Sequence, residues 1–198
     1  MDPLTVFPNK GIQDSGPISN RFLELGIDDF IRACRFVHEL PYGYNTNRDN
    51  MMLLFEEKVG SCTTKHAVIA TLALELNLPI SKWIGIYAMT EEIVAGTHHI
   101  LSKYALPYVP MLHCFLACGE YRVDLTEGNN NGKKRSIESF LYTQQVPPDI
   151  TAKNEYLLYR KALNDSIMKK KELSGIGIKR ILHAREEGLG LLKANLED

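Results

Sequence analysis

The segment Cys62–Asn77, CTTKHAVIATLALELN, is the feature that most constrains how the chain can fold. Its apolar residues are nearly continuous and recur with helical periodicity. Ser61 in front of it is a favourable N-cap, and Pro79 behind it bars continuation of a helix. The sequence therefore predicts a buried helix from Cys62 to about Asn77.

The chain before this helix predicts an irregular lead-in, further helices and one polar loop. Helical spacing of apolar residues, turn-forming residues and Pro or Gly breakers are the signals used. In order, the expected elements are a lead-in at 1–17, two helices within Ser19–Leu40 divided at Gly26 and Asp28, the loop Pro41–Asn50, and a short helix at Met51–Lys58 that ends near Gly60.

The chain after this helix predicts strands and then more helices. Runs of β-branched and aromatic residues indicate strands, and a Thr cap followed by acids indicates a helix start. The expected elements are a strand at Lys82–Met89, a short helix within Thr90–Leu106, a two-stranded hairpin at His113–Thr126 turning at Gly119-Glu120, a loop at Glu127–Arg135, and helices from Asp149 onward with an apolar stripe at Leu157, Leu158, Ala162 and Leu163. Strands segregated from helices favour an α+β fold with a mainly antiparallel sheet.

Composition and charge exclude several classes of protein. The chain has 198 residues and a net charge of -1, so no global basic field would attract nucleic acid or an anionic membrane. No apolar run reaches the length of a membrane span, and the N-terminus does not resemble a signal peptide. Four cysteines are too few for a disulfide scaffold of this size and indicate free thiols. We therefore expect a cytoplasmic protein with neither nucleic acid nor a membrane as partner.

Cys62 is a candidate nucleophile because it begins the predicted helix. The partial positive charge and unpaired N–H groups of a helix N-terminus favour a thiolate and can stabilise an oxyanion formed at the sulfur. A free cysteine is nevertheless more often a small buried side chain. A nucleophilic cysteine also needs a base, and the base needs an orienting group.

His113 and Asp124 are candidates for these two roles. If Gly119-Glu120 forms a two-residue turn, His113 lies opposite Thr126 and diagonal to Asp124, on one face of the hairpin. Alternatively, Asp124 ends its strand and pairs with a lysine or arginine, and a slip of one residue would separate the two side chains.

His66 is the rival base. It lies four residues after Cys62, so the two share a helix face. Ile69 and Ala73 continue that stripe, which favours an imidazole packed in the interior. Lys65 could lower the pKa of the thiol, but a solvated or structural cation is the commoner role.

The stretches GSCTTKHAVIATLALELNLP and HCFLACGEYRVDLT resemble the core of the transglutaminase-like superfamily, in a bacterial-type branch. The resemblance covers roughly Pro41–Thr126 and implies a papain-like Cys-His-Asp triad of Cys62, His113 and Asp124. The family often has Trp two residues after the histidine and then an acid, where this chain has Phe115 and Leu116-Ala117. The fold expected is one domain over residues 1–198, with the catalytic helix packed on an antiparallel sheet, a core at about 41–126, extra helices at both ends, and a helical extension at about 149–198.

The resemblance implies attack of the Cys62 thiol on an amide or ester of a peptide, a protein or a small molecule. The resulting acyl-enzyme would pass to water or to an amine, and hydrolysis without metal or other cofactor is the expectation. Asn45 and Asn47 are candidates for a second oxyanion donor, because the upstream loop must approach the thiol in this fold. A zinc site at His113, Cys114 and Cys118 is disfavoured, since alternation puts both cysteines on the face away from His113. The alternative to an enzyme is a non-catalytic binding module that retains the fold.

Overall fold

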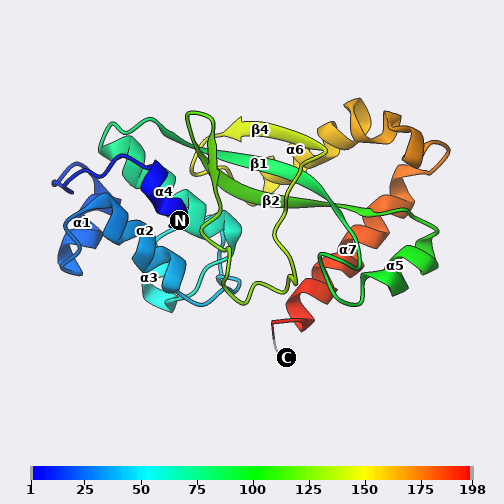
Figure 1. The fold of residues 1–198 in the computed structure, drawn as a ribbon, viewed down its shortest axis with the longest axis horizontal. Coiled ribbons are helices and arrows are strands. Elements are labelled where there is room, and N and C mark those ends of the chain that lie inside the picture. Colours follow the sequence, from blue (N-terminus) through cyan, green and yellow to red (C-terminus); the bar gives the residue numbers. More distant parts are fainter. Residues whose placement is uncertain (1, 197–198) are drawn as a thin grey trace. The chain divides into compact units, whose positions relative to one another are not determined.

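The computed structural model describes residues 2–196 (Figure 1), which form seven α-helices, three short 3-10 helices and four β-strands. The chain divides into two compact units. Unit 1 comprises Met1–Ile84, Cys114–Asn129 and Gln145–Thr151, and unit 2 comprises Gly85–His113, Asn130–Gln144 and Ala152–Asp198.

A four-stranded antiparallel sheet contributes residues to both units. Its strands are β1 (Ile80–Met89), β2 (Val109–Cys118), β3 (Tyr121–Val123) and β4 (Tyr142–Val146), in the spatial order β3-β2-β1-β4. Helices precede and follow these strands in the sequence, which confirms the predicted α+β class with an antiparallel sheet.

The β2–β3 hairpin has the predicted register. Leu116 pairs with Val123, and Cys118 pairs with Tyr121. Gly119-Glu120 is therefore the two-residue turn, and Gly119 adopts a φ of +57°, a left-handed conformation that costs a glycine little. The pairing ends at Val123, so Asp124 follows the last residue of β3.

Unit 1 is built around one buried helix. Its helices are η1 (Pro3–Val6), α1 (Pro17–Glu24), α2 (Phe30–Glu39), α3 (Leu53–Glu57) and α4 (Cys62–Glu75). Eleven of the fourteen residues of α4 are buried, as expected for a helix that is apolar on every side. The predicted helix at Cys62 and the predicted division between α1 and α2 are both confirmed.

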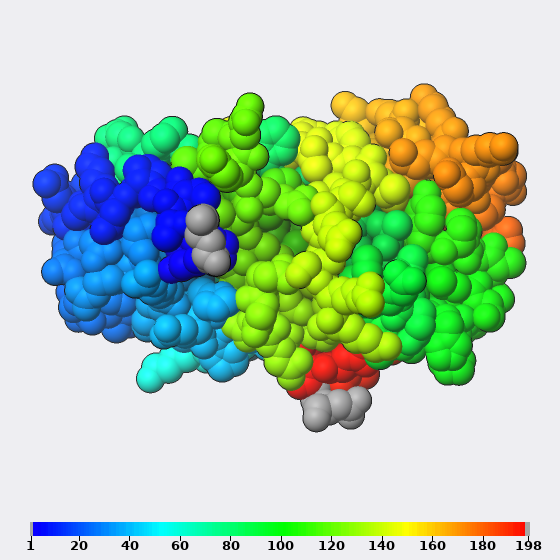
Figure 2. Space-filling view, in the orientation of Figure 1, coloured from blue at the N-terminus to red at the C-terminus, as the bar shows by residue number. Residues whose placement is uncertain are grey.

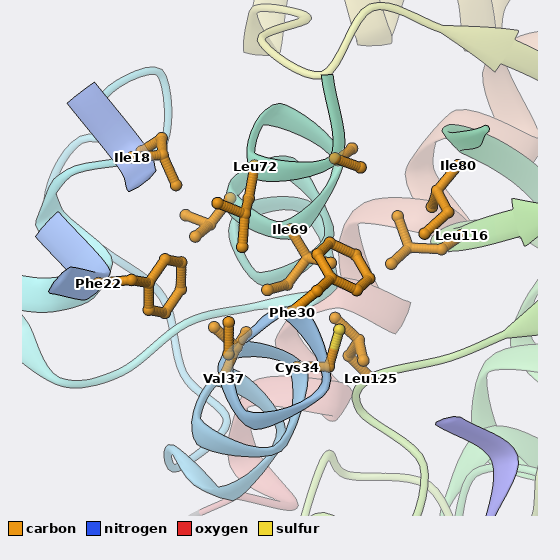
Figure 3. Close-up of a cluster of buried hydrophobic side chains, with 14 of the residues drawn as sticks. Ile18, Phe22, Phe30, Cys34, Val37, Ile69, Leu72, Ile80, Leu116 and Leu125 are labelled. Atoms are coloured by element: carbon orange, nitrogen blue, oxygen red, sulfur yellow. The ribbon is translucent and has the colours of Figure 1, made fainter. Parts of the chain in front are cut away.

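The core of unit 1 lies between α4 and its neighbours (Figure 3). Ile69 and Leu72 of α4 contribute to the same cluster as side chains from α1, α2 and the sheet. The labelled neighbours are Ile18, Phe22, Phe30, Cys34, Val37, Ile80, Leu116 and Leu125. Burial of this apolar surface fixes α4, and therefore fixes Cys62 at its first turn.

Polar contacts close the ends of the helices in unit 1. The Glu75 carboxylate, at the end of α4, accepts hydrogen bonds from the backbone N–H groups of Ile18 (3.1 Å) and Ser19 (2.6 Å) in the first turn of α1. The lead-in, dark blue in Figure 2, lies on the surface of this unit, where Asp2 forms an ion pair with Arg35 of α2 (2.9 Å). Helices α1, α2 and α3 all contact α4, and the Glu75 contact fixes its C-terminal end to the start of α1.

Unit 2 has a core of its own. Its helices are α5 (Thr97–Tyr104), α6 (Ala152–Asp165), η2 (Ile167–Lys169), η3 (Lys171–Leu173) and α7 (Ile178–Ala194). Tyr159 of α6 is fully buried and donates its hydroxyl to the carbonyl of Pro110 (2.8 Å). The stripe predicted for α6 is partly wrong: Ala162 and Leu163 are buried, but Leu157 is 55% exposed and Tyr159 takes its place.

The helix predicted within Thr90–Leu106 starts later than its Thr cap suggested. The segment before Thr97 forms turns, and α5 begins after Gly96, which has a φ of +85°. Glu91 accepts hydrogen bonds from the backbone N–H groups of Gly96 (3.2 Å) and His98 (3.1 Å). The acid expected inside the first turn instead caps the helix from a preceding turn, where it still faces the positive end of the helix.

Candidate functional site

Cys62 is the first residue of α4 and is 7% exposed. The residue before it, Ser61, has an extended backbone, and its carbonyl accepts the Lys65 N–H (2.9 Å) that starts the helix. The sulfur therefore lies at the end of α4 where backbone N–H groups have no partner within the helix. This placement favours a thiolate and offers donors to an oxyanion.

The loop Pro41–Asn50 reaches Cys62 through tyrosines. Tyr42 forms an isolated parallel bridge with Gly60, and the Gly43 N–H bonds the Gly60 carbonyl (3.3 Å). The Tyr42 hydroxyl is hydrogen-bonded to both the backbone N–H and the thiol of Cys62. Burial, and then the negative charge of a Cys62 thiolate, raise the pKa of Tyr42 well above its usual value of 10. Tyr42 is therefore a neutral phenol that touches the candidate nucleophile.

Tyr44 extends this aromatic lining. Its ring packs edge-on against Tyr42, with centroids 6.2 Å apart. Tyr44 is 43% exposed, and its partial burial and then the charge of Cys62 raise the pKa of its hydroxyl. Sequence reasoning expected this loop at the thiol but did not select the tyrosines, because nothing in PYGYNTNRDN distinguishes a tyrosine that contacts sulfur from one that merely packs.

Asn45 and Asn47 make the contacts of loop asparagines. Asn45 Nδ2 donates to Glu57 Oε2 and to the Val59 carbonyl, both at 2.9 Å. Asn47 Oδ1 accepts the N–H of Asp49 (3.0 Å) two residues on. Both hydrogens of the Asn45 amide are thus engaged in fixing the loop, and Asn47 closes a local turn.

His66 is fully buried and both of its ring nitrogens are engaged. Nδ1 lies 2.6 Å from the carbonyl of Cys62, and Nε2 accepts the backbone N–H of Leu125 at 2.8 Å. A carbonyl requires a donor and an N–H requires an acceptor, so the ring is the neutral tautomer protonated on Nδ1. In this state His66 has no ring nitrogen left to take a proton from Cys62.

Asp124 is fixed by a local turn directly after β3. Its Oδ1 accepts the backbone N–H (2.8 Å) and the hydroxyl (2.7 Å) of Thr126. The same oxygen lies 3.5 Å from His66 Nε2, and the side chain is 14% exposed. The carboxylate is therefore held next to the buried face of α4, in the same unit as Cys62.

Lys65 is a buried structural cation behind the site. Its Nζ donates to the carbonyls of His38 (3.1 Å) and Leu40 at the end of α2. Asn129 Nδ2 bonds the same two carbonyls at 2.6 and 2.9 Å. Burial lowers the pKa of Lys65 to about 8, although the charge of Asp124 opposes the shift. These contacts are those of a helix C-cap.

His113 lies on β2, is 3% exposed and belongs to unit 2. Its ring packs edge-on against Tyr87, with centroids 6.5 Å apart. The next residue, Cys114, belongs to unit 1, and its Sγ lies 3.6 Å from the hydroxyl of Thr63, the neighbour of Cys62. The structure thus brings Cys62, His66 and Asp124 together in unit 1, while the approach of His113 to Cys62 stays a prediction.

Neither a metal cluster nor a membrane-spanning helix is found in the part of the chain that the structure describes. Within residues 2–196, no group of three or more His, Cys, Asp or Glu side chains is arranged to hold a metal ion. No helix in the same range has the length and apolar character required to cross a membrane.

Comparison with known proteins found no counterpart. No protein-family model matches the chain, no curated protein matches it, and no solved structure matches it. The likeness to the transglutaminase-like superfamily accordingly rests on the residues of the chain itself.

Proposed function

We propose that the chain is a transglutaminase-like thiol enzyme with Cys62 as nucleophile, His113 as general base and Asp124 as the group that orients the base. The observation that carries the proposal is the surroundings of Cys62. Its sulfur begins a buried helix and touches a neutral tyrosine hydroxyl, and the same helix holds the segment with Asp124. A merely structural cysteine needs none of these neighbours.

The proposed reaction is acyl transfer through the sulfur. His113 takes the thiol proton, the thiolate attacks the carbonyl carbon of an amide or ester, and His113 returns the proton to the leaving group. The developing oxyanion receives the N–H of Cys62 and the O–H of Tyr42, which at present bond to each other. Tyr42 thereby supplies the second donor, for which the sequence suggested Asn45 or Asn47.

The second half of the reaction decides the class of enzyme. We propose water as the acceptor, which makes the protein a hydrolase of a peptide, protein or small amide or ester. An amine acceptor would make it a transferase by the same acyl-enzyme. The β2–β3 hairpin has the turn and register from which the shared face was inferred, although its pairing ends at Val123, one residue before Asp124.

A non-catalytic binding module is the second candidate. It is favoured by the low exposure of Cys62 and by its contact with Tyr42, since both limit access to the sulfur. In that case the fold is kept and Cys62 packs as a small side chain.

An activated ester separates the two candidates. The protein is incubated with p-nitrophenyl acetate at neutral pH, and the acetylated residues are located by peptide mass mapping. We expect rapid acetylation of Cys62, slowed about 10²–10⁴-fold in His113→Ala. The half-buried Cys118 is the internal reference for an ordinary thiol. Acetylation of Cys62 no faster than that of Cys118 would contradict the enzyme and favour the binding module.

A further inference from the structure

The buried ring of His66 connects two segments that are far apart in the sequence. Its Nδ1 donates to the carbonyl of Cys62, four residues earlier on α4. Its Nε2 accepts the N–H of Leu125, which is 59 residues away and directly follows Asp124. One imidazole therefore bonds the backbone that carries the proposed nucleophile and the backbone next to the proposed orienting carboxylate.

The Leu125 peptide is held from its other side as well. Its carbonyl lies 3.0 Å from Nδ1 of His38, a residue of α2. Asn129, four residues on, bonds the carbonyls of His38 and Leu40. With both its N–H and its C=O bonded to histidines, Leu125 is fixed in position relative to α2 and α4.

We propose that His66 is a positioning residue, whose neutral imidazole holds Asp124 at a set distance from Cys62. The inference rests on the proposed function, because it assigns His66 to the spacing of two members of the triad. It differs from the role of rival base, since neither ring nitrogen exchanges a proton with the thiol. It also differs from the role of an ordinary core histidine, which only fills space. Here Nε2 has to be unprotonated so that it can accept the Leu125 N–H.

The hydrogen-bond roles can be separated by substitution. In His66→Gln, the side-chain carbonyl can still accept the Leu125 N–H at a similar reach from the backbone. In His66→Asn, the shorter amide can bond within α4 but cannot reach Leu125. Val68→Ala is the matched control, because Val68 is fully buried on the same helix. Its truncation lowers stability without removing either hydrogen bond of the His66 ring.

Two measurements test the proposal. The first is the ring ¹⁵N spectrum of His66 in the wild-type protein at neutral pH, where we expect a protonated Nδ1 and an unprotonated Nε2. The second is the rate of Cys62 acetylation by p-nitrophenyl acetate together with the exchange rate of the Leu125 amide. We expect His66→Asn to slow acetylation about 10²-fold and speed Leu125 exchange, as a misplaced catalytic group would. His66→Gln should restore both to near the wild-type rates, and Val68→Ala should keep the wild-type acetylation rate.

The outcomes that overturn the proposal are distinct from those that overturn the enzyme. A His66 ring protonated on Nε2, or on both nitrogens, cannot accept the Leu125 N–H and so excludes the positioning role, whatever the reactivity of Cys62. Equal slowing in His66→Asn, His66→Gln and Val68→Ala assigns the effect to stability and removes the positioning role. If wild-type Cys62 itself does not acetylate, the proposed function fails. The ring spectrum and the Leu125 exchange rate still decide whether His66 bonds both the Cys62 carbonyl and the Leu125 N–H.

Discussion

Tyr42 is the residue of the candidate site whose proposed role is easiest to test. Its hydroxyl touches both the thiol and the backbone N–H of Cys62, and its raised pKa keeps the proton on the phenol at neutral pH. A neutral phenol can donate to an oxyanion, whereas a phenolate would repel it. In the proposed acyl transfer the hydroxyl donates to the oxyanion, a contribution that a reaction without an oxyanion does not use.

We predict that Tyr42→Phe slows acetylation of Cys62 by p-nitrophenyl acetate about 10²–10³-fold, the usual cost of one oxyanion donor. Alkylation of Cys62 by iodoacetamide, which forms no oxyanion, should slow far less in the same variant, because only the contact of the hydroxyl with the thiol is lost. Stopped-flow release of nitrophenol and mass mapping of the alkylated peptide measure the two rates. An equal loss in both would mean that Tyr42 acts on the thiol itself and supplies no oxyanion donor.

At the residue scale, the sequence predicted the local structure around the candidate residues better than their contacts. Helix periodicity and a cap identified Cys62 as the first residue of α4, and strand alternation selected Asp124. The partner of His66 was not predictable, because the Leu125 N–H comes from a turn whose approach to α4 depends on the packing of the core. The tyrosines were missed for the same reason.

Helix ends in this protein depend on carboxylates from neighbouring segments. Glu75, at the end of α4, accepts two N–H groups from the first turn of α1, and Glu91 caps α5 from a turn before it. Each joins two segments through a charge at a positive helix end. The elements are therefore coupled by polar contacts as well as by the core.

We predict that Glu75→Ala lowers the free energy of unfolding by about 1–2 kcal/mol, the usual effect of removing a helix cap. Urea denaturation followed by circular dichroism measures it. Glu24→Ala is the control, because Glu24 forms an exposed ion pair with Arg21 and its side chain is 61% exposed. The control should change stability by less than about 0.5 kcal/mol. Equal losses in the two variants would show that the Glu75 cap has no special role.

We predict that α5 loses stability as the pH falls from about 4.5 towards 2. The hydrogen bonds from the His98 side chain and backbone lower the pKa of Glu91 from 4.5 to about 2 in the folded protein. Because the folded pKa is the lower one, this stabilisation is fully present above the unfolded pKa and disappears as the folded carboxylate protonates. Amide exchange in Thr97–Tyr104 measures it, with Glu91→Gln as the reference. A wild-type exchange profile parallel to that of Glu91→Gln over this pH range would exclude the cap.

At the scale of elements, turn chemistry was predictable and strand length was not. Gly119-Glu120 identified the turn and register of the hairpin. β2, however, begins at Val109, four residues before the predicted strand. The early start was not predicted because a proline such as Pro110 disfavours the assignment of a strand. In the structure, the Pro110 carbonyl instead accepts the buried hydroxyl of Tyr159.

The whole molecule has two cores where the sequence suggested one domain with a helical extension. The C-terminal helices, predicted as an extension at about 149–198, share a unit with Gly85–His113. Both cores contain residues of β1 and β2, so no break in composition marks the division. Hydrophobic patterns indicate which residues are buried but not which of two cores receives them.

We predict that truncation after Thr151 destabilises the segment Gly85–His113 more than the first eighty residues. The truncation removes Tyr159, Leu163 and Ile181, each fully buried in the core of unit 2. Hydrogen exchange mapped by mass spectrometry would show early labelling of Gly85–His113. Unchanged protection there and an unchanged melting curve would show that the C-terminal segment is an independent appendage.

The central claim, that Cys62 is an activated nucleophile, is tested most directly by competition between the thiols of the intact protein. Cys34, Cys62 and Cys114 are buried and Cys118 is half-buried, so access alone predicts that iodoacetamide labels Cys118 first. An activated Cys62 is partly thiolate below the usual thiol pKa of about 8.5. At mildly acid pH we therefore predict that Cys62 is labelled first, and that His113→Ala and Asp124→Ala, still folded by circular dichroism, lose this preference. Labelling of Cys118 first, with Cys62 unmodified until the pH approaches that of a free thiol, would contradict the account.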